Sequence, residues 1–202
     1  MFVQVIQGEV ADPQHVHAAM ERWMSDLAPG ASGWLGSTAG VTADGRFVAF
    51  ARFESADAAR RNSARPEQDA WWSEASKAFT GDVTFIDSED VIEDIGADPD
   101  TAGFVQVMQG RATDPQRARE IMDSTPGSAR DFRPDIIGSL TVLHDDGAFT
   151  MAVYFTSEQE AREGERKEPP PELATQMAEL DSLAAGPLEF LDLTSPWLYS
   201  PR

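Results

Sequence analysis

A seven-residue segment occurs twice in this chain and sets the period of the sequence. FVQVIQG at residues 2–8 recurs as FVQVMQG at residues 104–110, which is 102 positions later. The Asp-Pro pair at residues 12–13 returns with the same spacing at residues 114–115. Self-similarity at a fixed period is the signature of a duplicated structural unit. The sequence therefore predicts two domains built on one plan.

The period divides the 202 residues into two parts of ordinary domain size. We predict a first repeat at residues 1–92, a second repeat at residues 103–202 and an acidic linker at residues 93–102. The strand pattern stops in the acidic stretch at residues 87–100, whose carboxylates we interpret as a solvated connection. A calcium-binding loop would need ligand spacing, a central Gly and a terminal Glu that this stretch lacks.

Hydrophobic periodicity and turn residues predict the same order of elements in both repeats. In the first repeat we expect a strand at residues 2–7, a helix from Pro13 to about Gly30, strands at 33–42 and 46–54, helices at 56–64 and 67–79, and a strand at 83–86. Asp44-Gly45 suits a tight hairpin between the second and third strands, because glycine accepts a positive φ. Each half is therefore predicted as βαββαβ, the ferredoxin-like arrangement.

The third strand carries apolar side chains on both faces. Phe47, Ala49 and Phe53 point one way, and Val48 and Phe50 point the other way. Two helices cover only one face of a ferredoxin-like sheet, so the second face needs another apolar layer. The fold class is predicted as α+β, with two ferredoxin-like repeats packed sheet to sheet as an intrachain dimeric α/β barrel.

Composition excludes several classes of function. The net charge of −19 disfavours nucleic acid and anionic membranes as partners. The absence of cysteine removes thiolate metal sites and cysteine nucleophiles, and it leaves open metal sites built from His, Asp and Glu. We predict no cofactor and no metal site. The chain starts on an apolar strand, with no signal-like segment and no long apolar run, so we expect a cytoplasmic protein.

The two-faced βαββαβ repeats resemble the dimeric α/β barrel superfamily, and specifically a fused tandem form of the antibiotic-biosynthesis-monooxygenase-like domain. The best single match is residues 52–72, a strand, a helix with paired small residues, and a Pro-Glu turn into a helix that carries tryptophan. The resemblance covers nearly the whole chain. Because one fold hosts many chemistries, it is more specific for fold than for activity.

The resemblance implies a cofactor-independent monooxygenase that acts on a small hydrophobic or aromatic metabolite. The alternative is a non-catalytic barrel that binds a small molecule or another protein. The superfamily also contains haem-degrading enzymes, but His15, His17 and His144 are more simply interpreted as solvated side chains. The resemblance also implies an intrachain pseudo-dimer, and it leaves further oligomerisation open.

Two groups of residues are candidates for the pocket of such a protein. Gln4 and Gln7 are polar residues on an otherwise apolar first strand, where the monooxygenases of this family carry an Asn. An amide there would hydrogen-bond a ligand, but both glutamines recur in the second repeat, which favours a structural role.

The second group surrounds the break between the two later helices, at the mouth of the family's cavity. Its members are Asn62, Ser63, Arg65, Trp71 and Trp72. They would supply a donor, a cation and a stacking surface, or they would be core and capping residues. The second repeat has Gly164, Gln176 and Met177 at the positions of Asn62 and the two tryptophans, so we expect a pocket in the first repeat. We expect Trp197 and Leu198 in the tail to dock and cover a sheet edge.

Overall fold

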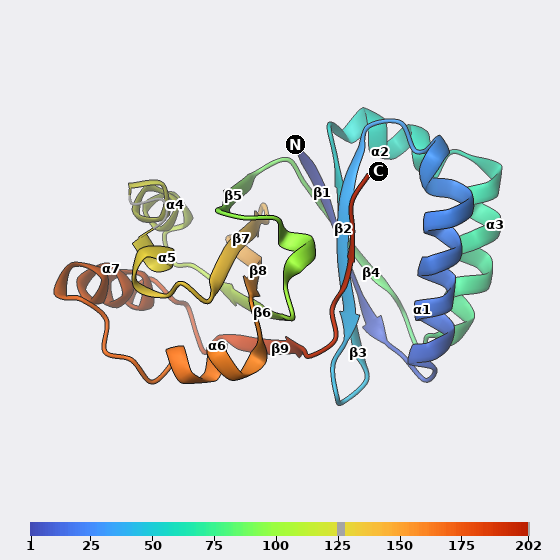
Figure 1. The fold of residues 1–202 in the computed structure, drawn as a ribbon. Coiled ribbons are helices and arrows are strands. Elements are labelled where there is room, and N and C mark those ends of the chain that lie inside the picture. The colour runs from blue at the N-terminus through green and yellow to red at the C-terminus, as the bar shows by residue number, and fades with distance from the viewer. Residues whose placement is uncertain (125–127, 202) are drawn as a thin grey trace. The chain divides into compact units, whose positions relative to one another are not determined.

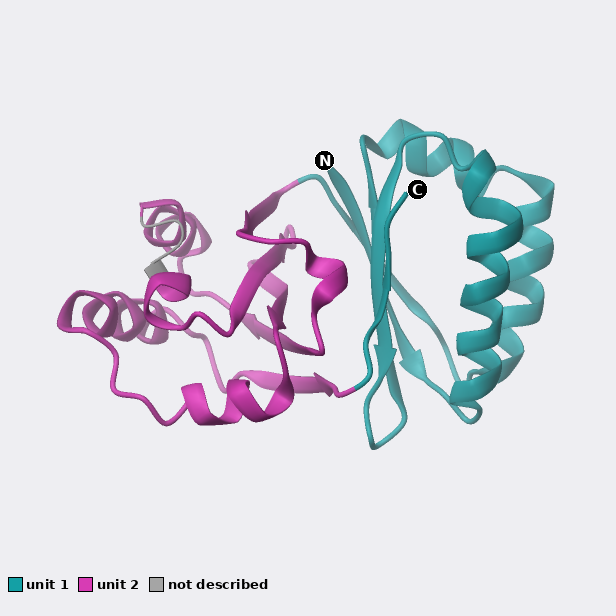
Figure 2. Cartoon of the chain, in the orientation of Figure 1, with its two compact units in different colours: residues 1–89, 195–202 teal, residues 90–194 magenta. Residues whose placement is uncertain are grey.

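The structure is a computed structural model that describes residues 1–124 and 128–201. It divides into two compact units (Figure 2), Met1–Glu89 with Ser195–Arg202, and Asp90–Thr194. Each unit contains a five-stranded antiparallel sheet with helices. The predicted α+β class with two ferredoxin-like repeats is therefore confirmed.

The first unit follows the βαββαβ order and gains one more strand from the end of the chain (Figure 1). Its elements are β1 (Phe2–Glu9), α1 (Pro13–Arg22), a π-helical turn η1 (Trp23–Leu27), a 3-10 turn η2 (Ala28–Gly30), β2 (Trp34–Val41), β3 (Arg46–Phe53), α2 (Ala56–Ser63), α3 (Pro66–Ala75), a 3-10 turn η3 (Ser76–Ala78), β4 (Thr84–Ser88) and β10 (Trp197–Tyr199). The strand order in the sheet is β10-β2-β3-β1-β4.

Local sequence signals start and stop these elements as predicted. The Asp12 carboxylate caps α1 by accepting a hydrogen bond from the backbone N–H of His15 at 3.0 Å, and Pro13 occupies the first turn. Ser55 caps α2 in the same way through the N–H of Ala58 at 3.2 Å. Gly45 has a φ of 88° in the β2–β3 hairpin, a conformation that glycine adopts without strain. These signals hold the helices in place over the sheet.

The core of the first unit lies between the sheet and helices α1 and α3, which run side by side (Figure 1). One buried cluster combines Trp23 and Leu27 with Trp34 and Phe53. A second cluster extends the core toward the other end of α1 and includes Val16 and Phe47. The Ala and Phe residues that alternate along β3 therefore face the helices, as the period-2 pattern predicts.

The second unit repeats this plan with its own helices. Its elements are β5 (Val91–Ile95), a 3-10 turn η4 (Pro99–Thr101), β6 (Phe104–Arg111), α4 (Pro115–Ser124), α5 (Ser128–Phe132), β7 (Ile136–Leu143), β8 (Ala148–Phe155), α6 (Glu158–Gly164), α7 (Pro171–Ser182) and β9 (Glu189–Leu193). The strand order is β5-β7-β8-β6-β9, which matches that of the first unit position by position.

Each sheet takes its edge strand from the segment that follows the other repeat. β10 follows β9 along the chain but pairs with β2, while β5 follows β4 along the chain and pairs with β7. Strand β5 was not anticipated, because its Glu93 and Asp94 made the segment resemble a solvated connection. The tail was expected to cover a sheet edge, and strand β10 does so by hydrogen bonding to β2.

Gly36 allows β10 to approach β2 closely. A Cβ at this position would lie 2.8 Å from the backbone oxygen of Tyr199, and the residue has a φ of 133°. Gly138 has the matching role in the second unit, where a Cβ would lie 2.7 Å from the backbone oxygen of Asp94. Both glycines sit at a β-bulge in the strand. Among the described helices, none is long and apolar enough to cross a membrane. The sheet-to-sheet packing of the repeats stays a prediction.

Candidate functional site

A cavity of about 710 Å³ lies in the first unit, between the end of α1 with the turns that follow it and the edge of the sheet that β10 forms. Its lining residues are Glu21, Met24, Ser25, Ala28, Pro29, Ala31, Trp34, Tyr199, Ser200 and Pro201. Its volume is within the range of small-molecule sites. Three different segments build its walls: the α1–η2 region, strand β2 and the chain end at β10.

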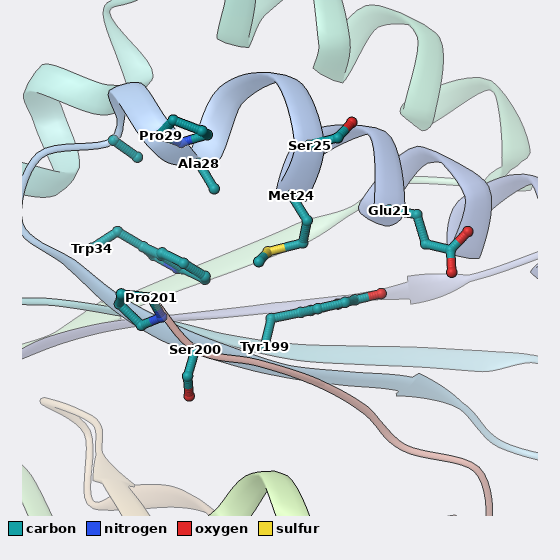
Figure 3. Close-up of a pocket in the computed structure, with 10 residues that line it drawn as sticks. Glu21, Met24, Ser25, Ala28, Pro29, Trp34, Tyr199, Ser200 and Pro201 are labelled. Atoms are coloured by element: carbon teal, nitrogen blue, oxygen red, sulfur yellow. The ribbon is translucent and has the colours of Figure 1, made fainter.

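The upper wall in Figure 3 is the widened turn η1. The N–H of Ala28 donates to the carbonyl of Trp23, five residues earlier, which defines a π-helical turn. Such turns inside helices are often found at functional sites, because they change the direction of the side chains that follow. Here the turn precedes Ala28 and Pro29, whose small side chains leave space against the sheet.

The apolar surface of the cavity consists of Trp34, Met24 and the ring of Tyr199 (Figure 3). The Trp34 indole N–H is satisfied by Ser37 Oγ at 3.0 Å, and Trp23 packs edge-on against the Trp34 ring with 5.1 Å between ring centroids. The Trp34 ring is thereby fixed in position. Aromatic faces and a thioether favour a flat, polarisable ligand.

The polar groups of the cavity are Glu21, Ser25, Tyr199 and Ser200. The Tyr199 hydroxyl is shielded from solvent and has no hydrogen-bond partner within the described residues. An unsatisfied buried hydroxyl costs about 1–3 kcal/mol. Burial, with a smaller contribution from the negative charge of Glu21, raises the pKa of Tyr199 to about 12. The hydroxyl therefore stays protonated at neutral pH and is a donor.

Two of the predicted site residues, Asn62 and Arg65, form hydrogen bonds that support η1 and do not line the cavity. Arg65 Nη1 donates to the backbone oxygen of Leu27 at 3.1 Å and to Asn62 Oδ1 at 2.9 Å. The Asn62 amide in turn donates to Gln68, whose amide oxygen also accepts from the Trp23 indole at 2.7 Å. Arg65 thus stabilises the carbonyl end of η1, where a cation is favoured.

The other residues predicted from the helix break lie farther from the cavity lining. The Trp71 indole donates to the backbone oxygen of Ala19 at 2.7 Å, at the junction of α1 and η1. Trp72 packs against Phe79 and Phe85, with ring centroids 6.0 Å and 5.3 Å away. Ser63 is exposed at the end of α2. Trp71 joins Asn62 and Arg65 around η1, whereas Trp72 and Ser63 lie elsewhere.

The two predicted glutamines occupy the first strand and do not line the cavity. Gln4 donates to the carboxylate of Asp87 on β4 at 2.8 Å, and Gln106 donates to Asp192 at 2.9 Å in the second repeat. This shared bond gives the retained glutamine a structural role. The Gln7 amide nitrogen is buried without a partner within the described part of the chain, while Gln109 donates to Thr150 at 3.1 Å.

The second unit has ion pairs where the first unit has the cavity. Ala28 and Ala31 correspond to Arg130 and Arg133, one period later. Arg130 forms an ion pair with Asp94 and donates to its backbone oxygen at 3.0 Å, and Asp94 is the β5 residue that corresponds to Tyr199. These charged side chains lie beside the edge strand at the positions that Ala28 and Tyr199 hold in the first unit.

Arg133 fills a further space in the second unit. It pairs with Asp135 at 2.6 Å and donates to the backbone oxygen of Ala161 at 3.0 Å. Its guanidinium occupies the space over Gly164, which is the position of Asn62 in the first repeat. The replacement of two arginines by Ala28 and Ala31 is a signal in the sequence that would have located the cavity.

A second cavity of about 700 Å³ lies among α4, α5 and α7 of the second unit. Its lining includes Arg117, Glu120 and Glu179, which pair with one another: Arg117 lies 2.5 Å from Glu179 and 3.3 Å from Glu120. These three charged groups satisfy one another, in contrast to the Tyr199 hydroxyl. Within residues 1–124 and 128–201, no three His, Asp or Glu side chains are grouped as a metal site.

Comparison with known proteins supports the fold. No family model matches the sequence, and none of the curated proteins matches it. A putative monooxygenase from Lactobacillus acidophilus superposes with a TM-score of 0.75, covering 98% of this chain and 95% of that one, at 14% identity. An anthrone oxidase-like protein superposes with a TM-score of 0.66, covering 100% of this chain and 91% of that one, at 13% identity.

This chain has the tandem fold of these monooxygenase-like proteins. The resemblance to the antibiotic-biosynthesis-monooxygenase-like fold is thereby confirmed at the level of structure. A regulator of staphylococcal pathogenesis also superposes over 100% of both chains, with a TM-score of 0.58 at 10% identity. Since one fold carries such different functions, activity must be argued from the cavity.

Proposed function

We propose that this protein is a cofactor-independent monooxygenase whose first unit binds a flat aromatic metabolite in the cavity beside β10. The observation that carries the proposal is a cavity of about 710 Å³ with two aromatic side chains, Trp34 and Tyr199, and the polar side chains of Glu21 and Ser25 in its lining. These are the features of a small-molecule site, in which apolar walls provide affinity and a few polar groups fix orientation. The likeness in fold to an anthrone oxidase-like protein supports this class of substrate.

The reaction needs no bound cofactor when the substrate supplies the electrons. Loss of a proton from an acidic CH2 group gives a carbanion, which reduces dioxygen and forms a C–O bond. Loss of water from the resulting hydroperoxide leaves a carbonyl group. One oxygen atom enters the product and the other leaves as water, so carbon is oxidised and dioxygen is reduced without an external reductant. The protein contributes orientation, a proton acceptor and stabilisation of the anion.

Binding and turnover can be measured separately in this protein. All five tryptophans lie in the first unit, so quenching of their fluorescence by anthrone reports binding there. Oxygen uptake with anthrone, and incorporation of one ¹⁸O atom from ¹⁸O₂ into anthraquinone, report turnover. We expect both signals, and we expect Ala28→Trp to abolish both by filling the cavity.

Leu173→Trp is the matched control, because it places the same bulk in the cavity of the second unit. It should leave anthrone binding and oxygen uptake unchanged. Oxygen uptake no faster than in buffer, across a panel of anthrones and polyphenols, would contradict the enzymatic proposal.

The second candidate is a non-catalytic protein that binds the same class of molecule. The fold it shares with the staphylococcal regulator supports this alternative. Anthrone binding that Ala28→Trp removes, without any oxygen uptake, is the result that would favour it.

A further inference from the structure

The cavity of about 700 Å³ among α4, α5 and α7 (Figure 1) lies where the first unit has a tryptophan. The Trp71 indole of the first unit donates to the backbone oxygen of Ala19 at 2.7 Å. Gln176 holds the matching position in the second repeat, and its amide donates to the backbone oxygen of Ile121 at 3.0 Å. The hydrogen bond is kept, but a side chain smaller than an indole makes it. Space therefore remains between the helices, and its volume is within the range of small-molecule sites.

The start of α7 lacks a cation that the first unit has at the matching place. Arg65 precedes α3 and forms an ion pair with Glu67 at 3.0 Å. Pro170 and Glu172 hold the matching positions in the second repeat, and both line the cavity. Within residues 1–124 and 128–201, the Glu172 carboxylate has no hydrogen bond or ion pair. The change from arginine to Pro170 therefore leaves this carboxylate without the cation that its counterpart has.

A second carboxylate and an aromatic ring come from α5. In the first unit a Cβ at Gly30 would lie 2.8 Å from Nη2 of Arg65, so that position adjoins the guanidinium. Phe132 holds the matching position in the second repeat and lines the cavity together with Asp131. Asp131 also has no hydrogen bond or ion pair among the described residues. A carboxylate and the face of an aromatic ring both attract an organic cation.

The rest of the lining is consistent with a cationic ligand that has an apolar body. Arg117 is the only cation among the described lining residues, and its charge is already paired with Glu120 and Glu179. Ile121 and Leu173 add aliphatic surface. With one aromatic ring and several aliphatic side chains, this cavity suits a compact aliphatic group, whereas Trp34 and Tyr199 suit a flat ring in the first unit.

We propose that the cavity of the second unit binds an organic amine, with its aliphatic body on Ile121 and Leu173 and its ammonium group beside Asp131 and Glu172. The ammonium group takes the place that the Arg65 guanidinium has in the first unit. This site is separate from the monooxygenase cavity, and it does not depend on the activity proposed there.

Three ligands that share one aliphatic body test the preference for a cation. The cation is 1-adamantylmethylammonium, the neutral ligand is 1-adamantanemethanol and the anion is 1-adamantanecarboxylate. Titration calorimetry at low ionic strength should show the ammonium bound roughly five- to thirty-fold more tightly than the alcohol, the effect expected of carboxylates near a protein surface. The anion should bind more weakly than the alcohol, and about 1 M NaCl should reduce the preference for the cation.

Neutral variants of the two carboxylates test their role. Asp131→Asn combined with Glu172→Gln should lower the affinity for the ammonium to that for the alcohol and leave the affinity for the alcohol unchanged. Asp82→Asn combined with Glu89→Gln is the matched control, because it removes the same charge from exposed positions of the first unit. It should preserve the preference, and loss of the preference there would show that net charge alone determines it.

Pro170→Arg tests whether the ligand replaces a protein cation. The backbone at Pro170 has φ −55° and ψ 151°, close to the φ of −73° and ψ of 130° at Arg65, so the variant should fold. The new guanidinium should pair with Glu172 and remove the preference for the ammonium. Pro170→Gln adds a long side chain without charge and should preserve it. A preference that survives Pro170→Arg would overturn the inference.

Two further variants decide which cavity holds the amine. Leu173→Trp fills the cavity of the second unit and should abolish binding of both the ammonium and the alcohol, whereas Ala28→Trp fills the cavity of the first unit and should have no effect. Binding that only Ala28→Trp removes, equal affinities for all three ligands, or no binding by any of them would overturn the inference. Binding of a lysine-rich peptide without binding of the ammonium would overturn it in favour of a protein partner.

Discussion

The two repeats share every main strand and helix but differ in the groove between the first helix and the edge strand. In the first unit this groove contains the pair Glu21 and Tyr199 above a cavity. In the second unit Asp123 and Asp94 occupy the same positions, and arginines pair with both: Arg119 lies 3.4 Å from Asp123, and Arg130 forms an ion pair with Asp94.

The comparison shows how two units of the same topology differ in the space beside their edge strands. Ion pairs beside an edge strand satisfy every partner and leave little for a ligand. In the first unit, small and aromatic residues at the matching positions leave space. The Tyr199 hydroxyl has no hydrogen-bond partner among the described residues. The difference depends on a few side chains, because backbone topology and bulge positions are the same in both units.

The largest effect is expected from removal of β10, the edge strand of the first sheet. Deletion of residues 195–202 removes Trp197 and Tyr199 from the first unit and exposes the edge of β2. Loss of this partly buried aromatic surface should lower the free energy of unfolding by about 3 kcal/mol and abolish anthrone binding. Urea unfolding followed by tryptophan fluorescence measures the first effect, and an unchanged midpoint would contradict it.

The next test converts the first unit to the pattern of the second. Ala28→Arg combined with Tyr199→Asp should reproduce the pair formed by Arg130 and Asp94 and close the cavity. Anthrone affinity should fall by at least about ten-fold, or about 1.4 kcal/mol, while thermal stability is retained. Retained affinity would show that this groove does not determine binding.

The reverse change tests the same idea in the second unit. Arg130→Ala removes the ion pair between Arg130 and the partly buried carboxylate of Asp94. The free energy of unfolding should fall by about 2 kcal/mol, the order expected for a hydrogen bond to a charged group. Urea unfolding measures this loss, and Asp94→Asn in the same background should recover part of it. No recovery would indicate that Arg130 acts through packing alone.

A smaller effect concerns the ionisation of Tyr199. Burial raises the pKa of Tyr199 to about 12 from an ordinary value of 10.0. The neutral phenol therefore contributes stability that is present below about pH 10 and is lost as pH rises through about 12. Tyrosinate absorbance, measured as the difference between the wild-type protein and Tyr199→Phe, should show this midpoint, and Glu21→Gln should move it lower. A midpoint at 10 would contradict the buried placement of the hydroxyl.

The smallest effects are expected from two variants that compare ring stacking with ion pairing, at His17 in the first unit and at Arg119 in the second. His17→Ala removes the stack on Trp197, and Arg119→Ala, at the matching position, removes the ion pairs with Asp123 and Asp90. Each should lower the free energy of unfolding by less than about 1 kcal/mol. In 1 M NaCl the effect of Arg119→Ala should disappear, because salt screens exposed charges, whereas the effect of His17→Ala should persist.

The repeated segment, the capping residues and the Asp-Gly hairpins were sufficient to predict the βαββαβ order. These signals are local, and the second copy confirmed each of them. Strand β5 was missed because Glu93 and Asp94 interrupt its apolar alternation, and only a distant strand, β7, makes it part of a sheet. Pairing with a distant partner leaves little trace in local composition.

The residues predicted for the site and the residues that line the cavity are different sets. Asn62, Arg65 and Trp71 are polar or aromatic residues near a helix break, which is the pattern that predicts a site, and they form hydrogen bonds around η1. The lining residues Ala28 and Ala31 have no distinctive chemistry of their own. They stand out only in comparison with Arg130 and Arg133 of the second repeat, because their small side chains leave space that the two arginines would occupy.

Strand β10 also fixes when the first unit can be completed during synthesis. Its partner β2 leaves the ribosome before the second repeat is made, and Trp197 follows Ser88 by more than a hundred residues. At about 5–20 residues per second, the first sheet waits roughly 5–20 seconds for its last strand. Until then the edge of β2 is unpaired and the cavity lacks Tyr199, so the cavity is completed only after translation has passed through residue 199.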